Sequence, residues 1–184
     1  MPPRLVCVCG VAGAGKTSVG RLLAERLRAA YVEGDALHPR ENVDKMAAGT
    51  PLTDEDRAPW LAACGAALRA AASAAGAAVS ASGPAAVLAC SALKSAYRQA
   101  LEAAAGEPIR FCLLDGSEAT LRRRLETRAG HFAGPALLSS QLATLERGAD
   151  IAMTLCIDDA TPEEIADGFA AAIEAEAEAG AAAS

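Results

Sequence analysis

Eight residues near the start of the chain, from Gly10 to Thr17, combine three glycines with a lysine and a threonine in the order G-V-A-G-A-G-K-T. This order fits G-x-x-x-x-G-K-[ST], the pattern of a loop that cradles phosphate groups with its backbone N–H groups. We expect the lysine to reach the β- and γ-phosphates of a nucleotide and the threonine hydroxyl to ligate Mg²⁺. The predicted nucleotide-binding residues are Gly10, Val11, Ala12, Gly13, Ala14, Gly15, Lys16 and Thr17, with Lys16 also catalytic and Thr17 also the metal ligand.

The segments on either side of the octet distinguish a phosphate site from a chance glycine-rich turn. Residues 4–9 form a short, mostly apolar run that is typical of a buried strand. After the octet, Val19, Leu22, Leu23 and Leu27 recur at helical spacing. A helix that begins at the loop adds the partial positive charge of its N-terminus to phosphate binding. Strand, loop and helix in this order favour the phosphate site.

A second polar stretch, Glu33–Asn42, reads E-G-D-A-L-H-P-R-E-N and follows the next predicted strand. A carboxylate at this strand end can accept or orient the proton of an attacking hydroxyl during phosphoryl transfer, and Asp35 is the candidate. Glu33, in contrast, could bind a water molecule of the Mg²⁺ coordination shell. His38 and Arg40 could bind a polar, anionic substrate. The competing interpretation is a capped turn, because Gly-Asp and His-Pro are common turn formers.

A third stretch, Thr50–Trp60, contains the single tryptophan of the chain beside a charged run. We interpret Trp60 as a core anchor. Arg57 is the candidate substrate ligand, because an anionic substrate favours the paired N–H groups of a guanidinium.

A fourth stretch, Ala89–Arg98, lies at the end of the third predicted strand. Ser91, Lys94 and Arg98 are candidate ligands of the substrate or of the transferring phosphoryl group. The alternative is a strand-to-helix turn with a solvated basic face. Cys90 is interpreted as a packing residue, because phosphoryl transfer needs no covalent thiol.

A fifth stretch, Leu121–Phe132, carries Arg124 and Arg128 four residues apart, which places them on one helix face. The glycine-rich residues that follow predict a mobile lid over about 122–140, whose arginines would stabilise charge on the phosphates. Arg128 is therefore predicted to be catalytic as well as nucleotide-binding. His131 is either a substrate contact or a cap of the lid.

Composition narrows the class of protein. Alanine supplies much of the 52% hydrophobic content and aromatic residues make up only 3%, so we expect an aliphatic, helix-rich core. A net charge of -6 disfavours nonspecific nucleic-acid binding.

Cysteines stand at positions 7, 9, 64, 90, 112 and 156 without a C-x-x-C pair, so we expect buried thiols in a reducing cytoplasm. No run reaches 18 apolar residues, and no cleavage-site pattern precedes the loop, so neither a membrane span nor a signal peptide is expected.

Strand and helix patterns alternate along the whole chain, which predicts one α/β domain over residues 1–184 with a parallel sheet covered on both faces. The predicted strands are Leu5–Cys9, Ala30–Glu33, Ala85–Cys90, Ile109–Leu114 and Met153–Ile157. The predicted helices are Lys16–Arg28, Asp54–Ala75, Ser95–Ala104, Glu118–Arg128, Pro135–Glu146 and Pro162–Glu176. Thr53 to Asp56 reads as a capping box, and Thr161-Pro162 as a helix start. Residues from about 178 to 184 are expected to fray.

Five strings of the chain resemble the gluconokinases of the P-loop, shikimate-kinase-like type, in order from about residue 4 to residue 158. They read G-V-A-G-A-G-K-T, E-G-D-A-L-H-P-R-E-N, P-L-T-D-E-D-R-A-P-W-L, C-S-A-L-K-S-A-Y-R and R-A-G-H-F. The resemblance implies ATP-dependent phosphorylation of D-gluconate to 6-phospho-D-gluconate, which feeds the pentose phosphate pathway. It also implies a five-stranded parallel sheet with a mobile lid, and often a homodimer.

Carried onto this chain, the resemblance places Gly10–Thr17 on ATP and Mg²⁺, with Arg124 and Arg128 clamping ATP. Asp35, His38, Arg57, Lys94 and Arg98 would face gluconate or its phosphate. Alanines at 12 and 14 depart from the serines common in the family, which backbone binding tolerates. Two alternatives remain: a related kinase acting on shikimate or adenylylsulfate, and a non-catalytic ATP-binding module.

Overall fold

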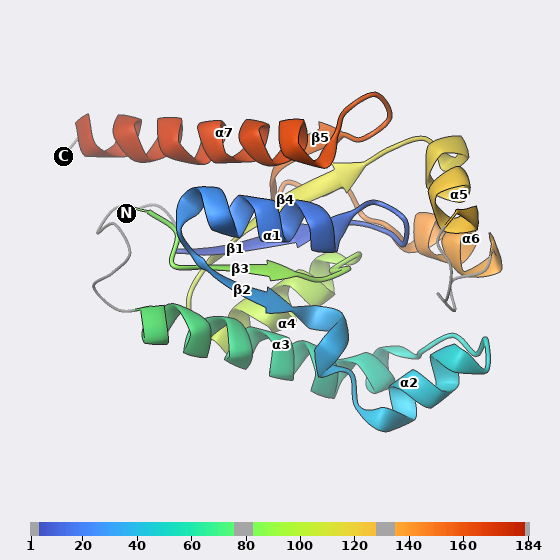
Figure 1. The fold of residues 1–184 in the computed structure, drawn as a ribbon. Coiled ribbons are helices and arrows are strands. Elements are labelled where there is room, and N and C mark those ends of the chain that lie inside the picture. Colours follow the sequence, from blue (N-terminus) through green and yellow to red (C-terminus); the bar gives the residue numbers. More distant parts are fainter. Residues whose placement is uncertain (1–3, 76–82, 128–134, 183–184) are drawn as a thin grey trace.

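The computed structural model describes residues 4–75, 83–127 and 135–182 (Figure 1). Five strands form one parallel sheet, as the sequence predicts, and their order is β2-β3-β1-β4-β5. The strands are β1 (Leu5–Cys9), β2 (Ala30–Glu33), β3 (Ala86–Ala89), β4 (Ile109–Asp115) and β5 (Ile151–Cys156). Central β1 is buried along its whole length between β3 and β4, which explains its unbroken apolar sequence.

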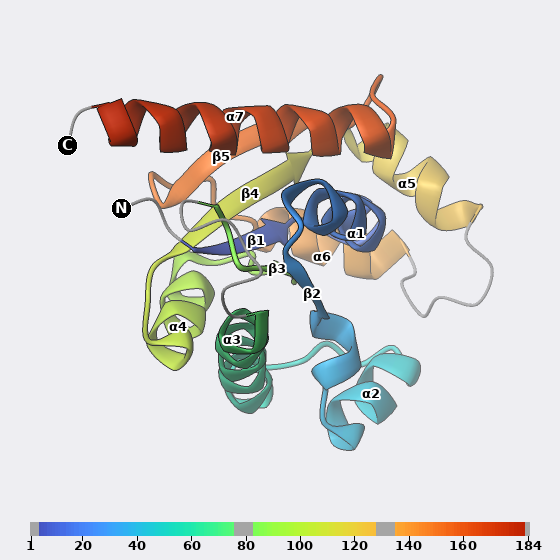
Figure 2. The same cartoon turned by 60° about the vertical axis from the view of Figure 1, so that its left-hand side comes forward.

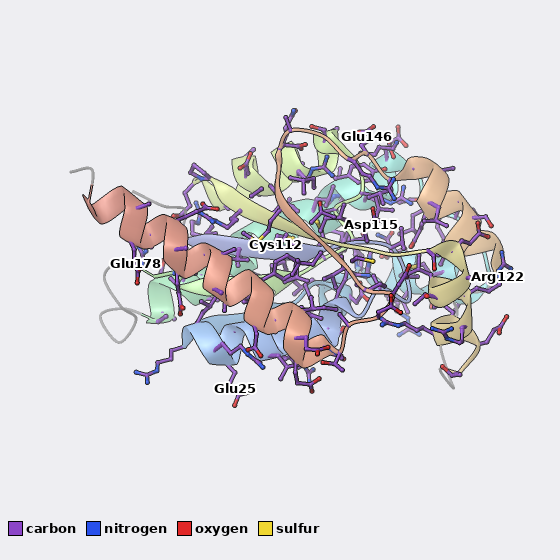
Figure 3. All side chains as sticks on the ribbon, turned by 90° about the horizontal axis from the view of Figure 1, so that it is seen from above. Glu25, Cys112, Asp115, Arg122, Glu146 and Glu178 are labelled. Atoms are coloured by element: carbon purple, nitrogen blue, oxygen red, sulfur yellow. The ribbon has the colours of Figure 1, made fainter. Side chains whose placement is uncertain are left out.

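Helices cover both faces of the sheet (Figures 1 and 2). On one face α1 (Lys16–Leu27) packs beside α7 (Pro162–Ala182), and on the other α3 (Asp54–Ala75) packs beside α4 (Ser95–Ala105). The remaining elements are the 3-10 helix η1 (Gly34–Leu37), α2 (Arg40–Ala47), α5 (Glu118–Glu126) and α6 (Pro135–Thr144). These four gather at the carboxyl ends of the strands (Figure 1). In Figure 3, Arg122 of α5 marks this end and Glu178 of α7 the opposite end.

Two helix starts confirm the capping signals in the sequence. At α3, the Thr53 N–H donates to Asp56 Oδ2 at 2.9 Å, and the Asp56 N–H donates to Thr53 Oγ1 at 3.2 Å. At α7, Thr161 and Glu164 exchange the same pair of bonds, at 2.8 and 3.2 Å. The α7 helix continues to Ala182, six residues beyond the predicted end at Glu176, and the fraying expected from about residue 178 stays a prediction. The alanine content of this end accounts for the longer helix.

Three further differences from the sequence prediction concern boundaries and burial. The helices η1 and α2 lie between the second predicted strand and the helix predicted from Asp54, where the sequence predicts no helix. β5 begins two residues earlier than expected. Five cysteines are buried as predicted, but Cys156 is exposed because it lies on the edge strand, where residues alternate between covered and open positions. Burial raises the pKa of Cys9 to about 12, which keeps that core group a neutral thiol.

Within the described ranges, no helix is both long and apolar enough to cross a membrane.

Candidate functional site

The loop between β1 and α1 has the backbone conformation that its glycines predict. Gly10, Gly13 and Gly15 have φ values of +144°, +82° and +95°. A Cβ at Gly10 would lie 2.7 Å from the Leu114 carbonyl oxygen, so a side chain is excluded there by space as well as by φ. Gly15 caps α1 without any side-chain bond to the first turn. The N–H groups of that turn are therefore left to a ligand, and an anion is the ligand that a helix N-terminus favours.

Lys16 folds back over this loop, where its Nζ donates to the Val11 carbonyl oxygen at 3.1 Å. Thr17 follows in the first turn of α1 and is half-buried. The Gly10 N–H donates to the Ser91 carbonyl oxygen at 3.2 Å, which joins the loop to the end of β3. The octet, Lys16 and Ser91 thus lie together at the carboxyl edge of the sheet.

Arg124 reaches the loop from α5. Its Nη1 donates to the Ala14 carbonyl oxygen at 3.5 Å, and its Nη2 donates to the Ile157 carbonyl oxygen at 2.8 Å. The guanidinium therefore lies beside the phosphate loop. Arg128, His131 and the central part of the expected lid lie outside the described residues.

On the other side of the sheet edge, Trp60 of α3 holds the turn that carries Asp35. The buried indole donates from Nε1 to the Gly34 carbonyl oxygen at 2.8 Å, so Trp60 is the core anchor that was predicted. A Cβ on Gly34 would lie 2.5 Å from the Ala89 carbonyl oxygen, so η1 packs directly on the end of β3. Asp35 is exposed on this turn.

His38 stacks on Trp60, with ring centroids 4.1 Å apart and an interplanar angle of 12°. Its Nδ1 lies 3.4 Å from the side-chain nitrogen of buried Asn42, which also donates to the Asp56 carbonyl oxygen at 2.8 Å. Burial lowers the pKa of His38, and the nearby Arg57 charge lowers it further, whereas Asp35 acts in the opposite direction. The neutral ring accepts at Nδ1 and therefore carries its proton on Nε2.

Arg57 and Lys94 meet in a cluster with Asp54 and Tyr97. Lys94 Nζ donates to both carboxylate oxygens of Asp54, at 2.8 and 3.1 Å. The Tyr97 hydroxyl donates to the same carboxylate and accepts from Arg57 Nη1 at 3.3 Å. Hydrogen bonds from Lys94 and Tyr97 lower the pKa of Asp54, which in turn raises the pKa of Lys94. Two cations and one carboxylate leave this cluster, 54/57/94/97, with a net charge of +1 at neutral pH.

The structure corrects the expectation that Arg98 faces the substrate. Its side chain is 1% exposed, and every guanidinium N–H is used inside the protein. Nε and Nη2 donate to the Asp150 carboxylate at 2.6 and 3.0 Å. The other bonds go to the carbonyl oxygens of Ala92, Leu93 and Glu146, at 2.9, 3.2 and 3.1 Å. Arg98 therefore fixes the loop between β3 and α4 that carries Lys94.

Four residues of this region were absent from the candidates drawn from the sequence. Asp54 contacts Lys94, Tyr97 contacts Arg57 and Asn42 contacts His38, and Gln141 of α6 contacts the phosphate loop. Asn42, Asp54 and Tyr97 fall within motif stretches already recognised, which is the signal that could have identified them. Gln141 contacts the loop from a part of the chain where the sequence shows no motif.

The sequence and the fold of this chain are similar to those of known proteins. A family model described as an AAA domain matches residues 5–148. The chain is 50% identical over 148 residues to a gluconokinase of Gluconobacter oxydans (strain 621H), covering 79% of this chain and 77% of that protein. It is 42% identical over 139 residues to the thermosensitive gluconokinase of Escherichia coli (strain K12), covering 75% and 69%. The crystal structure of a gluconokinase from Sinorhizobium meliloti 1021 superposes with a TM-score of 0.77 at 42% identity, covering 96% of this chain and 94% of that one.

Proposed function

The chain belongs to the gluconokinase family, and from this we propose that it transfers the γ-phosphoryl group of ATP to the 6-hydroxyl of D-gluconate, giving 6-phospho-D-gluconate and ADP. One structural observation supports the proposal independently of the family resemblance. The phosphate loop at Gly10–Thr17 is hydrogen-bonded from the Gly10 N–H to the Ser91 carbonyl oxygen, and Ser91 stands three residues before Lys94 of the 54/57/94/97 cluster. A site for phosphates and a site for an anion are thus supplied by neighbouring strand ends.

The phosphate half suits a nucleoside triphosphate bound with Mg²⁺. The uncapped first turn of α1 and the positive-φ glycines leave main-chain N–H groups for phosphate oxygens. We assign the Thr17 hydroxyl to Mg²⁺, which would draw its other ligands from phosphate oxygens and water. Among the residues that the structure describes, no group of three or more His, Cys, Asp or Glu side chains is placed to hold a metal ion. When bound, the metal would neutralise charge on the phosphates.

The acceptor half suits a sugar acid. The cluster's net positive charge favours the substrate carboxylate, with Lys94 and Arg57 as its donors. His38 can donate from Nε2 to a substrate hydroxyl, because its Nδ1 is occupied by Asn42. Ser91 stands at the junction between the two halves, at the end of β3.

In the reaction, the 6-hydroxyl oxygen of gluconate bonds to the γ-phosphorus while the bond from that phosphorus to the β–γ bridging oxygen breaks. The hydroxyl proton passes to the Asp35 carboxylate or, if Asp35 only orients the hydroxyl, to water. Lys16 and Arg124 act on the negative charge of the phosphates during transfer, and Lys16 must leave the Val11 carbonyl to do so. Arg128 and His131 would join from the lid.

We further propose that small molecules are the ligands, that the protein works in the cytoplasm as a homodimer, and that it does not bind nucleic acid. The net charge of -6 supports the last point. Light scattering on the purified protein tests the dimer.

The decisive experiment is an assay of ADP release with D-gluconate as acceptor, beside shikimate and adenylylsulfate at equal concentration. We expect turnover with gluconate and a phosphate monoester at its C6, identified by ³¹P and ¹³C spectra of the product. Turnover with shikimate or adenylylsulfate alone would overturn the substrate and keep the kinase. Nucleotide binding without turnover on any of the three would favour the non-catalytic module.

A further inference from the structure

Two adjacent residues of the loop between β5 and α7, Ile157 and Asp158, contact the helix that carries Arg124. The Ile157 carbonyl oxygen accepts a hydrogen bond from Arg124 Nη2 at 2.8 Å. Ser117, the N-cap of α5, donates from its N–H to both carboxylate oxygens of Asp158, at 2.9 and 3.2 Å, and its hydroxyl oxygen lies 3.2 Å from Asp158 Oδ1. The loop therefore holds α5 both at its start and at Arg124.

Ser117 and Arg124 lie on the same side of α5, because seven positions are close to two turns of an α-helix. Between them, Leu121 is only 1% exposed. A Cβ on Gly116 would lie 2.5 Å from Ile157 Cγ1 and 3.0 Å from Asp158 Oδ1, so the turn before α5 packs directly on the loop. A displacement of the helix start at Ser117 would therefore be carried along two turns to Arg124.

The same helix packs against the phosphate loop. A Cβ on Gly13 would lie 3.0 Å from the Leu121 carbonyl oxygen, and Arg124 Nη1 donates to the Ala14 carbonyl oxygen at 3.5 Å. Within the part of the chain that the structure describes, Arg124 donates to carbonyl oxygens and forms no ion pair. Its positive charge is thus available to an anion at the phosphate loop, provided that α5 keeps its place.

The end of β4 is fixed separately from the start of α5. Arg147 donates from Nε and Nη2 to the carboxylate of Asp115, at 2.7 and 2.8 Å, and the Ile157 N–H donates to the Asp115 carbonyl oxygen at 2.8 Å. Figure 3 labels Asp115, the last residue of β4. Loss of the Asp158 carboxylate should therefore loosen the start of α5 while the strand end and the loop backbone stay in place.

The half-buried Asp158 has the charge that this position favours. Hydrogen bonds from Ser117 lower the pKa of Asp158, and the nearby Arg124 charge lowers it further, so the carboxylate is ionised at neutral pH. A negative charge at a helix N-terminus is also stabilised by the partial positive charge of the first turn.

We propose that Asp158 is a positioning residue for phosphoryl transfer, which fixes the start of α5 and thereby holds Arg124 beside the phosphate loop. In this role Asp158 contacts neither reactant and acts through Arg124 alone. The inference rests on the proposed function, because it takes the Arg124 charge to act on the phosphates during transfer.

Single substitutions at Asp158 should affect catalysis in proportion to the bonds that they remove. Asp158→Ala removes every acceptor for Ser117 and should lower kcat about tenfold, with KM for gluconate changed by less than about twofold. Asp158→Asn keeps one oxygen acceptor for the Ser117 N–H and should recover most of the lost kcat. Asp159→Asn, at the exposed neighbouring position, is the matched control and should leave kcat unchanged.

A double-mutant cycle tests whether Asp158 acts through Arg124. Arg124→Ala alone should lower kcat about a hundredfold and weaken binding of a non-hydrolysable ATP analogue with an imido bridge (AMPPNP) roughly fivefold in titration calorimetry. Asp158→Ala alone should weaken AMPPNP binding roughly threefold. Where Arg124 is already replaced, adding Asp158→Ala should change either quantity by less than about twofold, because the group that Asp158 positions is gone.

Additive losses in the double variant would overturn the proposal, because Asp158 would then act without Arg124. A loss of stability in urea with kcat and AMPPNP affinity unchanged would also overturn it, since that result indicates a structural role only. If Asp158→Ala does not fold, as judged by circular dichroism, Ser117→Pro takes its place in the cycle. Ser117 has a φ of -64°, which proline adopts, and proline offers Asp158 neither an N–H nor a hydroxyl.

The losses in Ser117→Pro should likewise disappear when Arg124 is already replaced, and additive losses there would overturn the proposal. Failure to phosphorylate gluconate at all would instead count against the proposed function. The cycle on AMPPNP affinity would still decide the role of Asp158 in that case, because it needs only a nucleotide.

Discussion

Arg98 offers the sharpest test of how the acceptor side is built, because the sequence assigned it to substrate and the structure assigns it to the loop. The substitution Arg98→Lys keeps the positive charge and reduces the number of side-chain N–H donors from five to three. The guanidinium makes two bonds to Asp150 and three to backbone carbonyl oxygens. At least two of these five bonds must be lost. The Leu93 carbonyl keeps the Glu146 N–H and Asp150 Oδ2 keeps the Ser95 hydroxyl, so the carbonyl of buried Ala92 is the acceptor most exposed to the loss.

The expected loss of stability follows from that count. A buried acceptor left without a donor costs about 1–3 kcal/mol, so the loss at Ala92 should lower the free energy of unfolding by about that amount. For a chain of this size that corresponds to a fall in Tm of roughly 2–12 °C. Part of the ion pair with Asp150 survives, because lysine still neutralises that half-open carboxylate.

The measurement is urea unfolding followed by circular dichroism, paired with steady-state kinetics well below both melting temperatures. Arg123→Lys on an exposed position of α5 is the matched control and should change the free energy of unfolding by less than about 0.5 kcal/mol. For Arg98→Lys we expect the stability loss with a change in KM for gluconate of only a few-fold, since Lys94 remains in place. Unchanged stability together with a KM raised more than about tenfold would show that Arg98 binds substrate and that its role has been misjudged.

Four further outcomes test the remaining assignments. Lys16→Ala should lower kcat by about a thousandfold or more in the ADP-release assay, because its charge acts on the transferring phosphoryl group. Asp35→Asn should lower kcat about a hundredfold with an AMPPNP affinity within twofold of the unsubstituted value; an equal loss of nucleotide binding would contradict its place at the acceptor. Lys94→Met should raise KM for gluconate at least about tenfold and leave KM for ATP unchanged, because only the acceptor loses an ionic hydrogen bond. Burial lowers the pKa of His38 below its unfolded value near 6.5. The neutral ring therefore contributes its full stability above about pH 6.5, and this contribution is lost as pH falls through the lowered pKa. In His38→Phe, the free energy of unfolding in urea should vary less with pH between about 5 and 7.5.

The phosphate half could be predicted from the sequence because its chemistry is done by the main chain. Backbone N–H groups can approach phosphates only where glycines permit positive φ values, as at Gly13 and Gly15. That demand leaves a local pattern of fixed spacing. The strands and the long helices were predictable for a similar reason, since burial on both faces requires unbroken apolar runs and the capping residues stand within four positions of each other.

The acceptor half was less predictable because distant partners decide which way its side chains turn. Lys94 and Arg98 stand four residues apart and look alike in sequence. Asp54, 40 residues upstream, holds Lys94 at the surface, whereas Asp150, 52 residues downstream, draws Arg98 into the interior. The bond between Gln141 and Ala12 spans 129 residues. Long-range pairings of this kind carry no local period or spacing.

The phosphate loop and the proposed acceptor residues contribute differently to acceptor specificity. The loop bonds to phosphates in the same way whatever the acceptor, so it carries no information on which hydroxyl is phosphorylated. We propose that this choice falls to Lys94, Arg57 and His38. Each of them contacts a second residue that orients it: Asp54, Tyr97 and Trp60 respectively. A substitution at one of these supports would shift a substrate-binding group without touching substrate or nucleotide. The supports are therefore the positions at which the acceptor preference of this fold can change while its phosphoryl-transfer chemistry is kept.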